Sequence, residues 1–171
     1  MTDPPDPREW AITTPEPLRS DHAVDAFHCG KPPLDDWLKT RASRNEGRGS
    51  RTYVVCHGGS VVAYYCLASA GVQRASFPGS LSRNMPEPVP MMVLGRLAVH
   101  ARFQGRGLGE DLLKDAMRRA AQANRIAGFR ALLVHALDDE ACAFYAKFGF
   151  QEFPPGTRTL FLPVETFVAA L

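Results

Sequence analysis

Three glycines occupy every second position in the stretch RFQGRGLG, residues 102–109, beside two arginines and a glutamine. Glycine lets the backbone adopt positive φ and approach a ligand closely. An apolar run precedes the stretch and an amphipathic pattern follows it, so it would lead from a strand into a helix. The first N–H groups of a helix lack internal partners and favour an anion. The pattern predicts a phosphate-binding loop, with Arg102 and Arg106 adding charge-assisted bonds. A tight strand–helix connection without a ligand is the alternative.

The spacing of the glycines argues against the two commonest nucleotide loops. A P-loop needs a Lys-Ser or Lys-Thr pair after its last glycine, and none follows here. A dinucleotide-binding loop has GxGxxG spacing after the first strand of its fold. This loop has GxGxG spacing in the middle of the chain, so it fits both of these nucleotide loops poorly.

The elements around the loop follow from hydrophobic periodicity. We expect an apolar strand at 91–99 before the loop and an amphipathic helix from Leu108 to near Gly128 after it. The other expected elements are a strand at 9–13, a helix at 32–42, strands at 51–56 and 61–72 joined by the hairpin HGGS, a loop at 73–90, a strand at 130–136, a short helix capped by Asp138 or Asp139, and closing strands in GFQEF and RTLFLPV. This order predicts an α/β (α+β) fold with a mixed, mostly antiparallel sheet and flanking helices.

Length and composition predict one domain over residues 1–171, with the acidic, proline-rich residues 1–7 as a disordered leader. No apolar run reaches the roughly 18 residues that a membrane-spanning helix needs, and the start does not resemble a signal peptide. We therefore expect a cytoplasmic protein without a membrane partner. The four cysteines are scattered and no Cys/His group has zinc spacing, so we expect reduced thiols and no metal.

Charge is uneven along the chain although the formal net charge is only +2. Residues 30–51 and 94–130 are basic, whereas both ends are acidic. This distribution favours an anionic ligand or substrate at the central segments. Solvated charge on exposed faces would give the same pattern.

Two motifs resemble the GNAT N-acetyltransferase superfamily. QGRGLG (104–109) matches its [RQ]xxGx[GA] loop, and ACAFYAKFGF (141–150) is similar to its AxxxYxKxGF segment. Both lie in family order, and the strand pattern fits from about residue 50 to 150. The resemblance implies a GNAT fold with a splayed central strand pair, N-acetyltransferase activity and acetyl-CoA as cosubstrate. One departure is Asp138, where members often carry Asn; it puts a side-chain bond to pantetheine at 138 in doubt.

The resemblance also implies residue roles. Tyr145 would be the catalytic general acid that protonates the departing thiolate; an aromatic core position is the alternative. Backbone groups of Leu97 and Val99, at a bulge in the strand, would pair with pantetheine, and a free N–H there would polarise the thioester carbonyl. The residues expected to bind the cofactor are Leu97, Ala98, Val99, Gln104, Gly105, Arg106, Gly107, Leu108 and Gly109.

The absence of a carboxylate on strand 91–99 indicates which kind of amine accepts the acetyl group. Lysine has a pKa of about 10.4, whereas an α-amine titrates near 7.7–8.0, so a lysine acetyltransferase needs a strong base. Many lysine-acetylating members of the GNAT superfamily are similar to one another in carrying a Glu on the strand before the glycine loop. Strand 91–99 has no carboxylate, and the nearest, Glu87, lies in the preceding loop. An amine that is already largely neutral, such as that of an aminoacyl ester, fits better.

The whole chain resembles one branch, the acetyltransferase toxins of bacterial toxin–antitoxin modules. FHCGKPPLDDWL (27–38), LGRLAVHARFQGRGLG (94–109) and RTLFLPV (158–164) carry this resemblance. It implies acetylation of aminoacyl-tRNA, which blocks translation, neutralisation by a ribbon-helix-helix antitoxin, and a homodimer. The candidate RNA-binding residues are Arg44 and Arg48, at the early helix and its exit, and Arg96, beside the expected bulge in the strand; a merely solvated helix face is the alternative. The alternatives are an acetyltransferase of a small-molecule or protein amine, and a non-catalytic coenzyme A-binding module.

Overall fold

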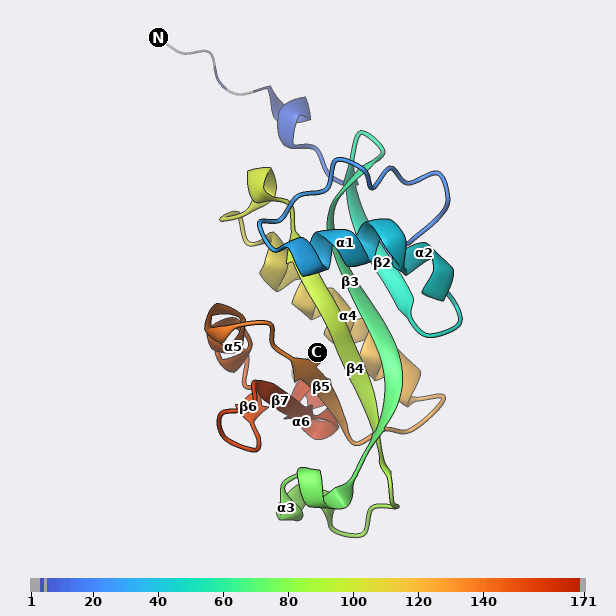
Figure 1. Ribbon diagram of the computed structural model, residues 1–171, viewed down its shortest axis with the longest axis vertical. Coiled ribbons are helices and arrows are strands. Elements are labelled where there is room, and N and C mark those ends of the chain that lie inside the picture. The colour runs from blue at the N-terminus through green and yellow to red at the C-terminus, as the bar shows by residue number, and fades with distance from the viewer. Residues whose placement is uncertain (1–3, 5, 170–171) are drawn as a thin grey trace. The chain divides into compact units, whose positions relative to one another are not determined.

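Seven strands form one sheet in the described part of the chain, which in this computed structural model is residue 4 and residues 6–169. The strand order is β1-β2-β3-β4-β5-β7-β6 (Figure 1). The strands are β1 (Glu16–Pro17), β2 (Arg51–His57), β3 (Ser60–Val72), β4 (Val89–Val99), β5 (Ala131–His135), β6 (Gln151–Glu152) and β7 (Thr159–Pro163). The helices are α1 (Pro32–Thr40), α2 (Ala42–Asn45), α3 (Gly79–Ser82), α4 (Leu108–Asn124), α5 (Asp139–Ala146) and α6 (Val164–Ala169), with 3-10 turns η1 (Pro7–Trp10), η2 (Arg74–Ser76) and η3 (Ala101–Phe103).

The strand pairing confirms the mixed, mostly antiparallel α/β fold. β1 pairs antiparallel with β2, and β7 pairs antiparallel with both β5 and β6. β4 and β5 are parallel, and α4 is the crossover that parallel neighbours need. Their register joins Met92–Leu94 to Leu132–Val134, whereas β4 itself continues to Val99.

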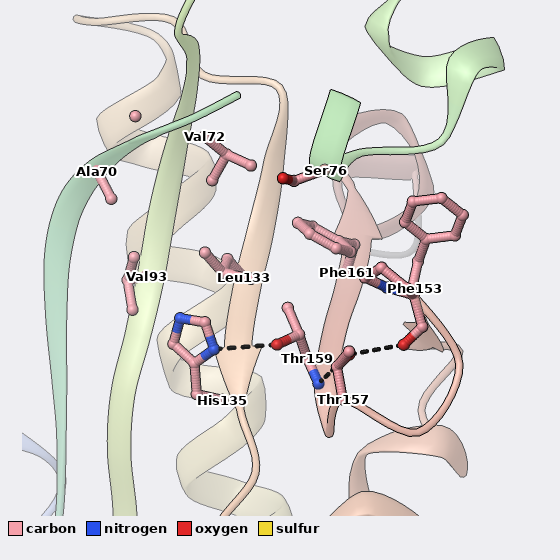
Figure 2. Close-up of a pocket in the computed structure, with 12 residues that line it drawn as sticks. Ala70, Val72, Ser76, Val93, Leu133, His135, Phe153, Thr157, Thr159 and Phe161 are labelled. Carbon is pink, nitrogen blue, oxygen red and sulfur yellow. Dashed lines mark hydrogen bonds between the residues drawn. The ribbon is translucent and has the colours of Figure 1, made fainter. Parts of the chain in front are cut away.

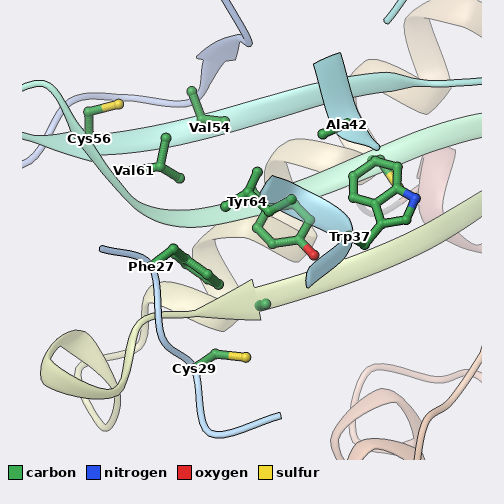
Figure 3. Close-up of a cluster of buried hydrophobic side chains, with 11 residues drawn as sticks. Phe27, Cys29, Trp37, Ala42, Val54, Cys56, Val61 and Tyr64 are labelled. Atoms are coloured by element: carbon green, nitrogen blue, oxygen red, sulfur yellow. The ribbon is translucent and has the colours of Figure 1, made fainter. Parts of the chain in front are cut away.

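The chain divides into two compact units, and each has its own core. The first unit runs to Cys66 and includes Arg96–Leu113; the second comprises Leu67–Gly95 and Lys114–Leu171. In the first, Phe27, Trp37 and Tyr64 pack with residues of β2 and with Ala98 (Figure 3). In the second, Phe77, Met91 and Phe161 belong to one buried cluster. The expectation of one domain over residues 1–171 stays a prediction.

Two expected elements near the amino terminus are wrong. Residues 9–13 do not form a strand: Pro7–Trp10 form η1, capped by the Asp6 carboxylate, and the first strand is β1. The expected helix at 32–42 is two helices. Arg41 separates α1 from α2 with φ −122° and ψ −29°, outside helical geometry.

Other boundaries differ by a few residues. The segment 73–90, expected to be a loop, contains η2 and α3, and β4 begins at Val89. α4 ends at Asn124, before the expected Gly128, because the Asn124 side chain donates to the Phe129 carbonyl and draws the chain into a turn. α6 was not expected; its apolar residues directly continue the last strand, and a short run does not distinguish strand from helix.

The expected leader, residues 1–7, falls partly outside the described residues, since residues 1–3 and 5 are not among them. Within the described residues, no helix has the length and apolar character that crossing a membrane requires.

Candidate active site

The glycine loop leads from β4 through η3 into α4, as the sequence predicts. Gly105 and Gly107 have φ of +76° and +82°, in the left-handed region that favours glycine. A Cβ added at either position would meet nothing within 4 Å, so both face open space. Gly109 lies in the first turn of α4, and the buried Leu108 anchors that turn.

The loop presents a row of backbone donors. No N–H group of residues 105–109 donates a hydrogen bond to another residue in the described part of the chain. The first internal bond runs from the Asp111 N–H to the Gly107 carbonyl, at 3.1 Å. Consecutive unpaired N–H groups at the start of a 17-residue helix form a site for an anion such as a phosphate.

Gln104 braces the loop. Its side-chain nitrogen donates to the carbonyls of Cys29, at 2.9 Å, and Val99, at 2.8 Å. The bond to Val99 ties the loop to the end of β4, and the bond to Cys29 ties it to the segment before α1. The Gln104 side chain therefore has a structural role that sequence reasoning missed.

The last residues of β4 alternate in burial. Ala98 is buried in the first unit's core, whereas Leu97 and Val99 are half-buried and point to the opposite face, as alternation along a strand requires. The Val99 carbonyl is already held by Gln104. This carbonyl is one of the backbone groups expected to pair with pantetheine. Only its second lone pair remains to accept a hydrogen bond from the coenzyme.

Arg102 and Arg106 meet the indole of Trp10. The Arg106 guanidinium carbon lies 3.4 Å from the ring centroid, and that of Arg102 lies 5.1 Å from it. Arg102 also forms an ion pair with Glu9 at 3.1 Å. Sequence reasoning missed Trp10, because a lone tryptophan in the expected strand 9–13 carries no motif.

Arg96 stands on an aromatic stack. Its guanidinium carbon lies 4.5 Å from the centroid of Trp37, which in turn stacks on Tyr64 with ring centroids 5.9 Å apart. The Tyr64 hydroxyl donates to the Leu34 carbonyl at 2.6 Å, and burial raises the pKa of this phenol. A cation–π contact leaves the in-plane guanidinium donors available.

The other expected RNA-binding residues lie at the end of the α1–α2 segment. Arg44 is exposed in α2, and Arg48 is exposed in the turn that follows it, not on a helix. Neither forms an ion pair within the described residues, whereas Arg51 contacts Glu46 at 3.4 Å.

Tyr145 lies in the last turn of α5, in the second unit. The residue is 6% exposed, and its ring packs against Phe144 and Phe150, with ring centroids 5.1 and 5.4 Å away. Asp138 caps this helix by accepting the Ala141 N–H at 2.9 Å. Asp and Asn are both strong caps, which accounts for an Asp where the family often has Asn.

The segment FHCGKPPLDDWL is mainly structural. The buried carboxylate of Asp35 accepts the Cys29 N–H at 2.9 Å and lies 3.5 Å from a ring nitrogen of His28. Burial, with the neighbouring Asp35, raises the pKa of the Cys29 thiol to about 11. Cys29 is therefore a neutral packing group and not a nucleophile.

The second unit contains a cavity of about 360 Å³ (Figure 2). Val72 and Val93 line it from β3 and β4, and Phe153 and Phe161 line it from the carboxyl-terminal strands and their loop. His135 lies at the cavity, and its Nδ1 is 3.2 Å from the Thr159 hydroxyl. Nothing in the sequence indicated this cavity.

One trio in the described residues has metal-ligand types in reach of one another: Glu16, His22 and Cys56, whose ligand atoms lie within 4.8 Å. The Arg19 N–H donates to His22 Nδ1 at 2.9 Å, so the ring hydrogen lies on Nε2, which contacts Glu16 at 2.9 Å. Both ring nitrogens are thus engaged in hydrogen bonds, so His22 and the half-buried Glu16 form a His–carboxylate pair beside the Cys56 thiol.

Comparison with known proteins places this geometry in context. Residues 8–150 match the model of the acetyltransferase (GNAT) family. A tRNA-acetylating toxin of Mycobacterium tuberculosis is 51% identical over 140 residues, which cover 81% of this chain and 84% of the relative. AtaT complexed with acetyl-methionyl-tRNAfMet has a TM-score of 0.84 at 29% identity, covering 94% of this chain and 99% of that one. AtaT bound to the carboxyl terminus of the antitoxin AtaR and to acetyl-CoA, a tyrosine-to-phenylalanine variant, has a TM-score of 0.81 at 28% identity, with coverage of 94% and 98%.

Proposed function

Because the chain belongs to the GNAT acetyltransferase family, we propose that it acetylates the amino group of an aminoacyl-tRNA and so blocks translation. The observation that carries this proposal is the 51% identity to a tRNA-acetylating toxin over 81% of the chain. The chain is an acetyl-CoA-dependent N-acetyltransferase, and the acceptor follows from that relative and from the AtaT complex with acetyl-methionyl-tRNAfMet.

The residues of the glycine loop fit the coenzyme. The unpaired N–H groups of residues 105–109 would bind its pyrophosphate, and the positive φ of Gly105 and Gly107 keeps side chains out of that approach. Leu97, Ala98 and Val99 would align pantetheine along the end of β4. When bound, the coenzyme supplies a thioester as the acetyl donor.

Tyr145 would act as the general acid. Its hydroxyl would donate a proton to the departing thiolate sulfur. The aromatic neighbours Phe144 and Phe150 would fix the ring and keep water from the hydroxyl. A phenol is neutral near pH 7, so it holds the proton that this step requires.

The acceptor needs no strong base. β4 carries no carboxylate, and Glu87, just before it, is exposed and accepts the Arg74 N–H at 3.1 Å. An α-amine with a pKa of about 7.7–8.0 has a sizeable neutral fraction at cellular pH, and that fraction can attack directly. Arg44, Arg48 and Arg96 would contact the phosphates of the tRNA.

We propose a ribbon-helix-helix antitoxin as the neutralising partner and a homodimer as the active form. The AtaT structure with the antitoxin AtaR supports an antitoxin partner. An aminoacyl-tRNA acceptor would place the activity in the cytoplasm.

The deciding experiment offers the protein acetyl-CoA with three acceptors: charged tRNA, uncharged tRNA and a lysine peptide. Mass spectrometry should find the acetyl group on the aminoacyl moiety alone. Acetyl groups on the peptide but not on charged tRNA would make it a protein acetyltransferase. Coenzyme binding without transfer to any acceptor would make it a non-catalytic module.

A further inference from the structure

The short turn η1 supplies a platform for the arginines of the glycine loop. Trp10, the last residue of η1, lies under the guanidinium of Arg106, 3.4 Å from ring centroid to carbon, and beside that of Arg102, at 5.1 Å. The indole also meets the buried ring of Phe103 edge to face, with centroids 5.4 Å apart. A residue more than ninety positions away in sequence thus contacts the loop.

The type of contact matters for a ligand. A guanidinium stacked on an indole uses its π face, and its in-plane N–H groups keep their freedom to donate. Arg106 forms no ion pair or side-chain hydrogen bond within the described residues. Arg102 gives one nitrogen to Glu9 at 3.1 Å. A carboxylate partner would compete with an anionic ligand for these donors, whereas an indole does not.

Hydrogen bonds to the end of β2 hold the segment that carries Trp10 in place. The Thr13 N–H donates to the Cys56 carbonyl, and the Cys56 N–H donates to the Thr13 hydroxyl, both at 2.9 Å. His57 Nδ1 lies 2.7 Å from the Ala11 carbonyl. These bonds hold the backbone that directly follows Trp10. The indole is therefore preorganised beside the guanidinium groups.

We propose that Trp10 is a positioning residue for the coenzyme. It holds Arg106, with Arg102 beside it, next to the unpaired N–H groups of the loop, so that guanidinium donors bond a phosphate group of coenzyme A. Preorganised arginine loses less rotamer entropy on binding a phosphate. The inference rests on the proposed coenzyme site and is independent of the acceptor.

A double-mutant cycle on coenzyme A binding tests this step without any turnover. Isothermal titration calorimetry measures the Kd of coenzyme A for the wild type, Trp10→Ala, Arg106→Gln and the double variant. We expect Trp10→Ala to weaken binding about 5- to 20-fold. In the Arg106→Gln background the same change should add no more than about twofold. Arg8→Ala is the matched control, because Arg8 also lies in η1 but its guanidinium pairs with Asp6. The Kd of coenzyme A for this variant should equal that of the wild type.

The outcomes separate this role from others. An unchanged Kd in Trp10→Ala would overturn the proposal, and so would fully multiplicative effects of the two substitutions, which would make Trp10 act without Arg106. A Trp10 effect that persists with 3′-dephospho-coenzyme A supports a contact to the pyrophosphate, and one that vanishes supports the 3′-phosphate. Failure of tRNA acetylation in the wild type would reject the proposed acceptor and leave these affinities untouched.

Discussion

The hydroxyl of Tyr145 is the smallest group on which the proposed chemistry depends. Tyr145→Phe keeps the ring that packs against Phe144 and Phe150, so the fold should persist. We expect acetylation to fall on the order of 10²- to 10⁴-fold, the loss typical of a positioned general acid. Single-turnover rates with charged tRNA measure the loss, and calorimetry with coenzyme A serves as the control for binding. A near wild-type rate would return Tyr145 to a packing role.

Gly107 tests the loop at a single backbone position. Gly107→Asp would place a carboxylate in the open space before the N–H groups, at a φ of +82° that strains any side chain. We expect coenzyme A binding to be lost, because charge and volume both oppose a phosphate there. Gly59→Asp is the matched control, since Gly59 has a φ of +84° and equally open surroundings in the β2–β3 turn. If both variants bind equally, the loop is not the phosphate site.

Cys29 provides a pH-dependent prediction. Burial raises the pKa of its thiol from 9.0 to about 11, so about one thiol in a thousand is ionised at pH 8. Iodoacetamide should label Cys29 far more slowly in the folded protein than in urea, as peptide mass spectrometry can measure. Above pH 9 the unfolded thiol ionises before the folded one, so this residue's contribution to stability is lost as pH rises from 9 towards 11. Native labelling as fast as in urea would show an accessible thiolate.

At the scale of elements, hydrophobic patterning predicted β2 to β5, β7, α4 and α5, whereas β1 was not expected. The same rule failed at residues 9–13, where alternation suggests a strand but the Asp6 cap and Pro7 start a 3-10 turn. The rule also predicted one continuous helix across Arg41, because Trp37, Leu38 and Ala42, on the two sides of the break, are all buried. Contacts between distant residues, such as Trp10 with Arg106 and Gln104 with Cys29, have no local signal.

The residues of the candidate site also differ in whether the sequence alone could predict them. The glycines of the site and Tyr145 could be proposed from motifs, the glycines because backbone conformation restricts residue type locally and Tyr145 because of its position in the family segment. The contacts that position other side chains of the site could not be predicted. Trp37 carries Arg96, and Asp35 holds the Cys29 N–H, only after the chain between them has folded.

The α1–α2 segment carries the prediction about RNA. Arg44 and Arg48 are exposed and form no ion pairs within the described residues, so they can contact phosphates at little cost. Replacing both by Glu should raise the KM for charged tRNA about tenfold or more while the Kd of coenzyme A stays unchanged. For net charge, each single replacement, Arg44→Glu or Arg48→Glu, is compared with Arg125→Glu, at an exposed arginine just after α4, because all three change the charge by the same amount. Equal effects of these single changes would mean that the tRNA responds to overall charge alone.

For the whole molecule, the basic segments 30–51 and 94–130 carry the positive field that an RNA substrate requires. Both segments contribute residues to the first unit, which also holds the glycine loop. Counterion release would make acetylation of charged tRNA weaken steeply with added salt. A small-molecule amine would show almost no such dependence, since it displaces few counterions.

The identity of the acceptor also determines how the rate varies with pH. With no carboxylate on β4 to remove a proton, the rate should follow the neutral fraction of the amine itself. For an aminoacyl ester, kcat/KM should rise with a pKa no higher than that of a free α-amine, about 7.7–8.0, and then level off. A lysine acceptor would instead drive the profile upward towards pH 10. Initial rates between pH 6 and pH 9.5, measured with charged tRNA and with a lysine peptide in the same buffers, distinguish the two. Tyr145→Phe should lower the plateau and leave the midpoint in place, because the amine and not the phenol sets it; a midpoint that moves would assign the titration to Tyr145.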